Sequence, residues 1–157
     1  MIRIGNGFDV HRLQEGLPFR LGGLPVPFTK GCEAHSDGDV LIHAICDALL
    51  GAAALGDIGL HFPDTDEAYE NIDSKVLLAK TAVLILAAGY TVNNIDTVVC
   101  LEKPKIKDYI VPMRETLAKV LTISVEQISI KATTCERLGF IGREEGVAAY
   151  AVALLQR

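Results

Sequence analysis

No run of basic residues longer than scattered pairs occurs in this sequence, which carries 15 Lys and Arg against 20 Asp and Glu. Nucleic-acid-binding proteins usually gather Lys and Arg into a patch, so this charge pattern argues against a nucleic-acid partner. The most apolar stretch, residues 81–89, falls well short of the roughly 20 residues that cross a bilayer. The first residues, MIRIGNGFDVH, lack the charged and then apolar segments of a leader. We therefore expect a cytoplasmic protein that binds neither nucleic acid nor a membrane.

The cysteines are few and widely spaced, with no CxxC pair, at Cys32, Cys46, Cys100 and Cys135. This spacing excludes a zinc knuckle and a disulfide framework, so we expect buried free thiols. The chain has 157 residues, half of them apolar. This length suffices for one hydrophobic core and is too short for two, which predicts a single domain over residues 1–157.

Extended and helical patterns alternate along the chain. Apolar and polar residues alternate from Ile2 to His11, which predicts a first strand. The pair Gly22-Gly23 predicts a short hairpin between residues 18–24 and 25–28. Further patterns predict helices over 37–55, 73–89 and 112–121, strands over 91–101, 127–134 and 147–155, and a loop over 56–71. This order predicts an α/β fold, an α+β sandwich in which helices pack on one face of a mixed sheet.

Two of the predicted helices carry further signals. Ser36 and Asp39 have the spacing of a capping box, which places the start of the first helix near Asp37. The second helix has almost no polar face, because no charged residue occurs from Thr81 through Asn94. A helix buried all round in so small a domain predicts a subunit interface.

The histidines all lie within the first 61 residues, at His11, His35, His43 and His61. Asp9 and His11 stand two apart on the predicted strand, so their side chains project from one face and can share an ion. With His43 as third ligand, two nitrogens, one carboxylate oxygen and an open fourth position are typical of catalytic zinc. Asp39 or Asp47, four residues either side of His43, would then orient its imidazole. The alternative is a hydrogen-bonded core histidine and a turn aspartate, and spacing alone does not decide.

Two polar segments suggest binding functions. The acidic loop over 56–66 lacks the glycine and glutamate of an EF-hand, so calcium is not supported. Its carboxylates, flanked by glycines, suit sugar hydroxyls, or they belong to a solvated turn. Residues 131–140 carry a strand into a turn with hydroxyls, amides and a carboxylate, which suits phosphate oxygens and a hard cation such as Mg²⁺. The alternative there is a plain capping sequence.

Longer motifs are GFDVHRL at 7–13, AHSDGDV at 34–40, DALLGA at 47–52, LGDIG at 55–59, FPDTD at 62–66 and KATTCERLGFIGREEG at 131–146. Over essentially its whole length, the chain resembles the 2-C-methyl-D-erythritol 2,4-cyclodiphosphate synthases of non-mevalonate isoprenoid biosynthesis. The zinc ligands of that family fall on Asp9, His11 and His43. Asn6 departs from the family, where a histidine is common.

The resemblance implies a role for each matching residue. His35 and Thr134 would be catalytic and stabilise the transition state, and Glu136 would hold Mg²⁺ or Mn²⁺ together with the substrate diphosphate. The implied substrate contacts are Asp9, Val10, His11, His35 and Ser36 near the zinc; Asp57, Ile58 and Gly59 at sugar hydroxyls; Phe62, Pro63, Asp64, Thr65 and Asp66 in a mobile loop; Leu101, Glu102, Lys103, Pro104, Lys105, Ile106 and Lys107 around cytidine; Thr133, Thr134, Cys135 and Glu136 at the diphosphate; and Phe140 and Arg143 near a trimer axis.

The implied activity is that of a phosphorus–oxygen lyase. It would convert 4-diphosphocytidyl-2-C-methyl-D-erythritol 2-phosphate to the 2,4-cyclodiphosphate with release of CMP, in a single catalytic domain of a homotrimer with active sites at subunit interfaces. One rival is a zinc phosphoesterase that activates water, although two-metal hydrolases usually need bridging carboxylates around both ions. The other is a non-catalytic trimer that binds a metal or an isoprenoid. The reaction product distinguishes these functions.

Overall fold

A computed structural model describes residues 1–157 and contains a mixed five-stranded sheet in the order β4-β1-β7-β5-β6. The strands are β1 (Ile2–Glu15), β4 (Lys30–Glu33), β5 (Thr91–Cys100), β6 (Ile128–Thr133) and β7 (Gly146–Gln156). Strands β5 and β6 run parallel, and the other neighbours are antiparallel. A separate hairpin joins β2 (Arg20–Leu21) to β3 (Leu24–Pro25).

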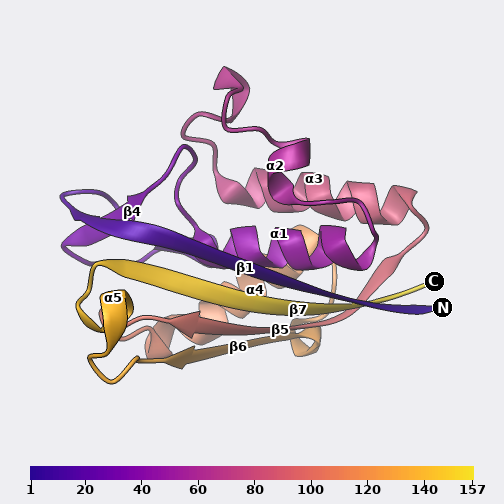
Figure 1. The fold of residues 1–157 in the computed structure, drawn as a ribbon. Coiled ribbons are helices and arrows are strands. Elements are labelled where there is room, and N and C mark those ends of the chain that lie inside the picture. The colour runs from indigo at the N-terminus through magenta and orange to yellow at the C-terminus, as the bar shows by residue number, and fades with distance from the viewer.

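Three long helices lie on one side of the sheet (Figure 1). They are α1 (Val40–Ala52), α3 (Ser74–Ala87) and α4 (Ile110–Leu121). Helix α1 packs on β1 and β7, α3 packs on α1, and α4 packs on β6. Short helical turns are α2 (Ile58–His61), α5 (Gly139–Gly142), η1 (Glu67–Tyr69), η2 (Lys107–Tyr109) and η3 (Val125–Gln127). The predicted mixed α/β fold is confirmed. None of the helices has the length and apolar character needed to span a bilayer.

The predicted elements occur with shifted ends. The first strand continues beyond His11 to Glu15, and β4 was not predicted at all. Gly22 and Gly23 form the predicted hairpin turn with φ of 59° and 80°, a conformation that favours glycine. The predicted loop over 56–71 contains two short helical turns. All four cysteines are free as predicted, but Cys100 and Cys135 are only half-buried.

The predicted capping box at the start of α1 is wrong. Asp39 is the cap, because its Oδ1 accepts a hydrogen bond from the amide of Ile42 at 3.0 Å. The same carboxylate also accepts from the amides of Gly22 at 3.0 Å and Gly23 at 2.6 Å. Asp39 therefore ties the hairpin to the helix, and the Ser36 hydroxyl is left for another partner.

Helix α1, rather than α3, is covered on nearly all sides, with ten of its 13 residues buried. In α3, Val83 and Leu86 are 66 % and 64 % exposed. The placement of α3 at a subunit interface stays a prediction.

The opposite face of the sheet carries uncovered apolar side chains. Ile2, Ile4, Phe8 and Val10 of β1 alternate with Gly5, Gly7, Asp9 and His11, and the two sets point to opposite faces, as the alternation in the sequence predicted. The first set is 41–71 % exposed, so the apolar side of β1 faces away from the helices.

Two glycines of β1 allow α1 to lie directly on the strand. A Cβ at Gly7 would overlap the carbonyl oxygen of Ala44, and a Cβ at Gly5 would overlap that of Ala48. The alanines are four residues apart and so lie on one face of α1. The two glycines of β1 and the two alanines of α1 therefore set the short distance between helix and strand.

We expect Gly7→Ala to lower the free energy of unfolding by about 1–3 kcal/mol, because the methyl group overpacks this contact. Urea denaturation measures the effect. Gly51→Ala in the same helix is the control, since its Cβ would lie 3.9 Å from the Asn6 carbonyl oxygen. That change should be neutral or slightly stabilising. A Gly7→Ala protein as stable as the wild type would show that the contact is not tight.

Candidate metal centre and pockets

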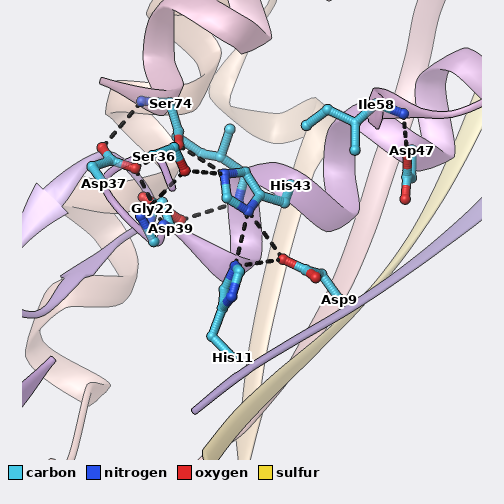
Figure 2. Close-up of polar contacts among 12 residues, drawn as sticks. Asp9, His11, Gly22, Ser36, Asp37, Asp39, His43, Asp47, Ile58 and Ser74 are labelled. Carbon is cyan, nitrogen blue, oxygen red and sulfur yellow. Dashed lines mark hydrogen bonds and ion pairs between the residues drawn. The ribbon is translucent and has the colours of Figure 1, made fainter. Parts of the chain in front are cut away.

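Asp9, His11 and His43 bring three ligand atoms together (Figure 2). Asp9 Oδ2 lies 2.9 Å from His11 Nε2 and 3.0 Å from His43 Nδ1, and the two ring nitrogens are 3.0 Å apart. A tetrahedral zinc ion with bonds of about 2.0–2.1 Å separates its ligand atoms by about 3.3 Å, slightly more than these distances. The two nitrogens and one carboxylate oxygen therefore fit a metal ion after a small outward adjustment.

The charges of this cluster depend on one another. Burial alone would raise the pKa of the Asp9 carboxyl, but hydrogen bonds to His11 and His43 outweigh it and hold that pKa well below its usual range. Burial alone would lower the pKa of His43, but its hydrogen bond with Asp9 raises it. Asp9 is therefore an anion at neutral pH. A metal ion at this site has to compete with a proton on His43.

The second ring nitrogen of His43 contacts two serine hydroxyls. His43 Nε2 lies 2.9 Å from Ser74 Oγ and 3.1 Å from Ser36 Oγ (Figure 2). Ser74 in turn donates hydrogen bonds to Asp37 from both its hydroxyl and its amide. Sequence reasoning missed Ser74, because Asp73-Ser74 reads only as the start of a helix.

The prediction that Asp39 or Asp47 orients the imidazole is wrong. Asp39 accepts from the Ile42 amide at the helix cap and from the Gly22 and Gly23 amides of the hairpin, and burial raises its pKa. Asp47 Oδ1 accepts a hydrogen bond from the amide of Ile58 at 2.7 Å and so anchors the start of α2 (Figure 2). Spacing of four residues places Asp39, His43 and Asp47 near one face of α1. Both carboxylates nevertheless accept from backbone amides rather than from His43.

A cavity of about 350 Å³, here called the metal-side cavity, opens beside the cluster. Besides His43, it is lined by eight of the predicted site residues, His11, His35, Ser36, Ile58, Gly59, Phe62, Pro63 and Asp64. The side chains of Asp57 and Asp66 instead cap short helical turns, accepting from the amides of Leu60 and Ala68 at 2.9 Å. Thr65 is exposed and does not line the cavity.

A second cavity, of about 300 Å³, lies where β5 and β6 end and is called the strand-end cavity. The predicted residues that line it are Leu101, Pro104, Lys105, Ile106, Lys107, Thr133 and Thr134. Glu102 lies outside and accepts a hydrogen bond from the Cys135 amide at 3.3 Å, while Lys103 pairs with Glu144 at 2.9 Å. The two cavities share no lining residue.

The remaining predicted residues lie around the turn after β6. Thr134 Oγ1 donates a hydrogen bond to Glu136 Oε1 at 3.3 Å, and Glu136 adopts a left-handed backbone with φ of 51°. Phe140 lines a third cavity, of about 560 Å³, which Val10 and His11 also line. Arg143 pairs with Glu145 at 3.0 Å.

Comparisons with known proteins agree over nearly the whole chain. The YgbB family matches residues 2–156. A protein of Porphyromonas gingivalis named 2-C-methyl-D-erythritol 2,4-cyclodiphosphate synthase is 59% identical over 98% of this chain and 94% of its own. A Bacteroides thetaiotaomicron protein of the same name is 58% identical over 99% of this chain and 98% of its own.

Solved structures give the same result. The bifunctional IspDF of Campylobacter jejuni superposes with a TM-score of 0.95 and 45% identity over 99% of this chain, which spans 42% of that longer protein. A 2C-methyl-D-erythritol-2,4-cyclodiphosphate synthase in a form bound to CDP superposes with a TM-score of 0.91 at 40% identity, over 98% of this chain and 100% of its own.

We expect His43→Ala to lose metal binding, because the change removes one of three ligand atoms. The protein should stay folded, because the other buried residues of α1 and the Asp39 cap still hold the helix in place. Metal analysis after dialysis against zinc, with circular dichroism as a check on folding, measures both. His61→Ala is the matched control, since His61 bonds to the Leu55 carbonyl at 2.8 Å outside the cluster. A full complement of zinc in His43→Ala would contradict the assignment of His43 as a metal ligand.

Proposed function

The chain belongs to the YgbB family, and we propose that it converts 4-diphosphocytidyl-2-C-methyl-D-erythritol 2-phosphate to 2-C-methyl-D-erythritol 2,4-cyclodiphosphate and CMP. It is a phosphorus–oxygen lyase of isoprenoid biosynthesis, with residues 1–157 forming its catalytic domain. The observation that carries the proposal is the Asp9–His11–His43 cluster, whose two histidines line the same cavity as His35 and Ser36.

The reaction needs no protein nucleophile. An oxygen of the 2-phosphate attacks the β-phosphorus in line, and the bond from that phosphorus to the oxygen bridging the α-phosphate breaks. CMP leaves with the electron pair of that bond. A phosphate with a second pKa near ~6 is already an anion at neutral pH, so a strong general base is not needed. The work left to the protein is to hold two anionic groups together and to neutralise charge on the leaving oxygen.

The residues divide this work between two cations. Asp9, His11 and His43 would hold Zn²⁺, and Glu136 would hold Mg²⁺ or Mn²⁺ with the substrate diphosphate. Ions held by these residues would supply Lewis-acid stabilisation of the phosphate oxygens. His35 and Thr134 stabilise the transition state by hydrogen bonding to oxygens that gain charge.

The other proposed contacts follow the cavities. Ser36 and segments 57–59 and 62–66 hold the methylerythritol part at the metal-side cavity. Segment 101–107 holds cytidine at the strand-end cavity, whose Lys105 and Lys107 also bring positive charge toward the diphosphate. Thr133 and Cys135 flank the diphosphate, and Phe140 and Arg143 lie near the axis of the assembly.

We propose that the enzyme is a homotrimer that assembles through the open face of the sheet, in place of the interface on α3 that its uncharged segment predicted. Six large apolar side chains of β1 and β7 are 41–71 % exposed there, whereas α3 exposes three. Because no residue lines both cavities, one chain supplies the metal side of each active site and a neighbour supplies the nucleotide side.

The activity is tested by incubating the protein with zinc, magnesium and the cytidine diphosphate substrate, with the products followed by phosphorus NMR. We expect one CMP for each cyclic diphosphate formed. An opened phosphate in place of the cyclic product would identify a zinc phosphoesterase instead. A protein that binds zinc but releases no CMP would be the non-catalytic alternative.

We expect Glu136→Gln to keep zinc but to lower turnover by a factor on the order of 100 or more, comparable to loss of one preorganised electrostatic stabiliser. Its response to added magnesium should also be weak, while CMP binding stays nearly intact. Turnover is measured across a magnesium titration, with Glu115→Gln on the exposed side of α4 as the control. Near-normal turnover with unchanged magnesium dependence would mean that phosphates and water alone hold the second cation.

We expect light scattering to find a trimer, and Phe8→Glu to shift it to inactive monomers, because the charge falls on the apolar sheet face. Phe8 is 47 % exposed, so the fold should tolerate the change. Val83→Glu on α3 is the matched control and should leave the trimer intact. The opposite pattern would place the interface on α3, and an active monomer would contradict the shared active site.

A further inference from the structure

The imidazole of His43 is connected to the half-buried carboxylate of Asp37 through one hydroxyl. Ser74 is fully buried at the first turn of α3, and its Oγ lies 2.9 Å from His43 Nε2. On its other side, the same oxygen lies 2.5 Å from Asp37 Oδ1. The chain of contacts therefore runs from the metal cluster through His43 and Ser74 to Asp37.

The carboxylate at the far end is firmly placed. Asp37 Oδ2 accepts from the Ser74 amide at 3.1 Å, and Oδ1 accepts from the Asp39 amide at 3.2 Å. The Asp37 amide donates to the Ile72 carbonyl at 3.1 Å. The negative charge also lies at the N-terminus of a helix of 14 residues, where the helix dipole favours an anion.

These contacts determine the positions of two protons, the one on the Ser74 hydroxyl and the one on His43 Nε2. An ionised carboxylate can only accept, so the Ser74 hydroxyl donates its single proton to Asp37. A lone pair of Ser74 Oγ then faces His43 Nε2, and that nitrogen must carry a proton. If Nε2 were unprotonated, two lone pairs would face each other at 2.9 Å. Nε2 therefore keeps its proton whether or not Nδ1 carries one. Nδ1 can donate a proton to Asp9, and once an ion replaces that proton the imidazole is neutral and presents its lone pair on Nδ1, the nitrogen that faces Asp9 and His11.

We propose that Ser74 and Asp37 are positioning residues of the metal centre, which fix His43 in the tautomer and orientation that present Nδ1 to the ion. This inference rests on the proposed metal site but not on the proposed reaction. Ser36, the other neighbour of Nε2, is less constrained. It is only half-buried, its hydroxyl accepts a long 3.4 Å bond from the Gly38 amide, and it lines the metal-side cavity.

The test measures zinc affinity by competition with a chromogenic chelator, in the full chain without substrate. Ser74→Ala should weaken zinc binding about 10–100-fold, as loss of a partner behind a ligating histidine typically does. Ser74→Thr keeps the hydroxyl and should recover much of the affinity. Asp73→Ala is the matched control. It removes the cap of α3, in which Asp73 accepts from the Lys75 amide at 2.9 Å, and leaves the His43–Ser74–Asp37 contacts intact.

A second measurement reports on the hydrogen bond between His43 and Ser74 itself. In the zinc-loaded wild type, ¹H–¹⁵N NMR of the imidazole should show a proton on His43 Nε2 that exchanges slowly with solvent, and Ser74→Ala should speed that exchange. If Ser74→Ala does not fold, Asp37→Asn carries both measurements. Equal losses of affinity in Ser74→Ala and Asp73→Ala, or no loss in either, would overturn the proposal. A wild type that binds no zinc would instead refute the metal site proposed above.

Discussion

The close approach of helix α1 to strand β1 is the constraint on which the Asp9–His11–His43 cluster depends. Gly5 and Gly7 have no side chain, so the helix backbone at Ala44 and Ala48 lies directly on the strand. His43 directly precedes Ala44, and only at this short separation does its Nδ1 come within 3.0 Å of the Asp9 carboxylate. The three side chains therefore come from two elements that pack backbone against backbone, which is the preorganisation that an electrostatic catalyst requires.

Aspartates hold the frame around this cluster by accepting backbone amides from distant segments. Asp39 joins the hairpin to α1, Asp37 joins the turn after β4 to α3, and Asp47 joins α1 to the start of α2. The bonds of Asp37 and Asp47 join elements that line the metal-side cavity, whereas those of Asp39 hold the hairpin against α1. The acidic residues of the AHSDGDV segment are thus used mainly to place loops, while its histidine and serine face the cavity.

The sequence predicted those features that depend on local periodicity. Alternation along β1 correctly placed Asp9 and His11 on one face, and the glycine pair correctly placed the hairpin. The predicted cap at Ser36 was wrong because Ser36 and Asp39 could both accept the helix amides. Asp39 is the cap, since it is also held by the amides of Gly22 and Gly23, which are distant in sequence. The role of Ser74 was invisible for the same reason, since its partners His43 and Asp37 are 31 and 37 residues away. Local signals thus predicted elements and faces, whereas partners set by tertiary packing could not be read from them.

The positions of the two cavities on the sheet favour an active site shared between chains. The register pairs His11 with Val147 and Cys100 with Ala148, so the metal cluster and the strand-end cavity lie at the same end of the sheet. They are nevertheless separated laterally, because β7 and β5 intervene between β1 and β6. Three strand spacings of about 4.8 Å give roughly 14 Å from β1 to β6. A diphosphate spans far less than this separation, which favours a site where the β-phosphate meets the candidate metal ligands of one chain and Thr134 and Glu136 of another. A second copy that brought its β6 end to the metal-side cavity would remove the gap, and this lateral separation supports the proposed assembly.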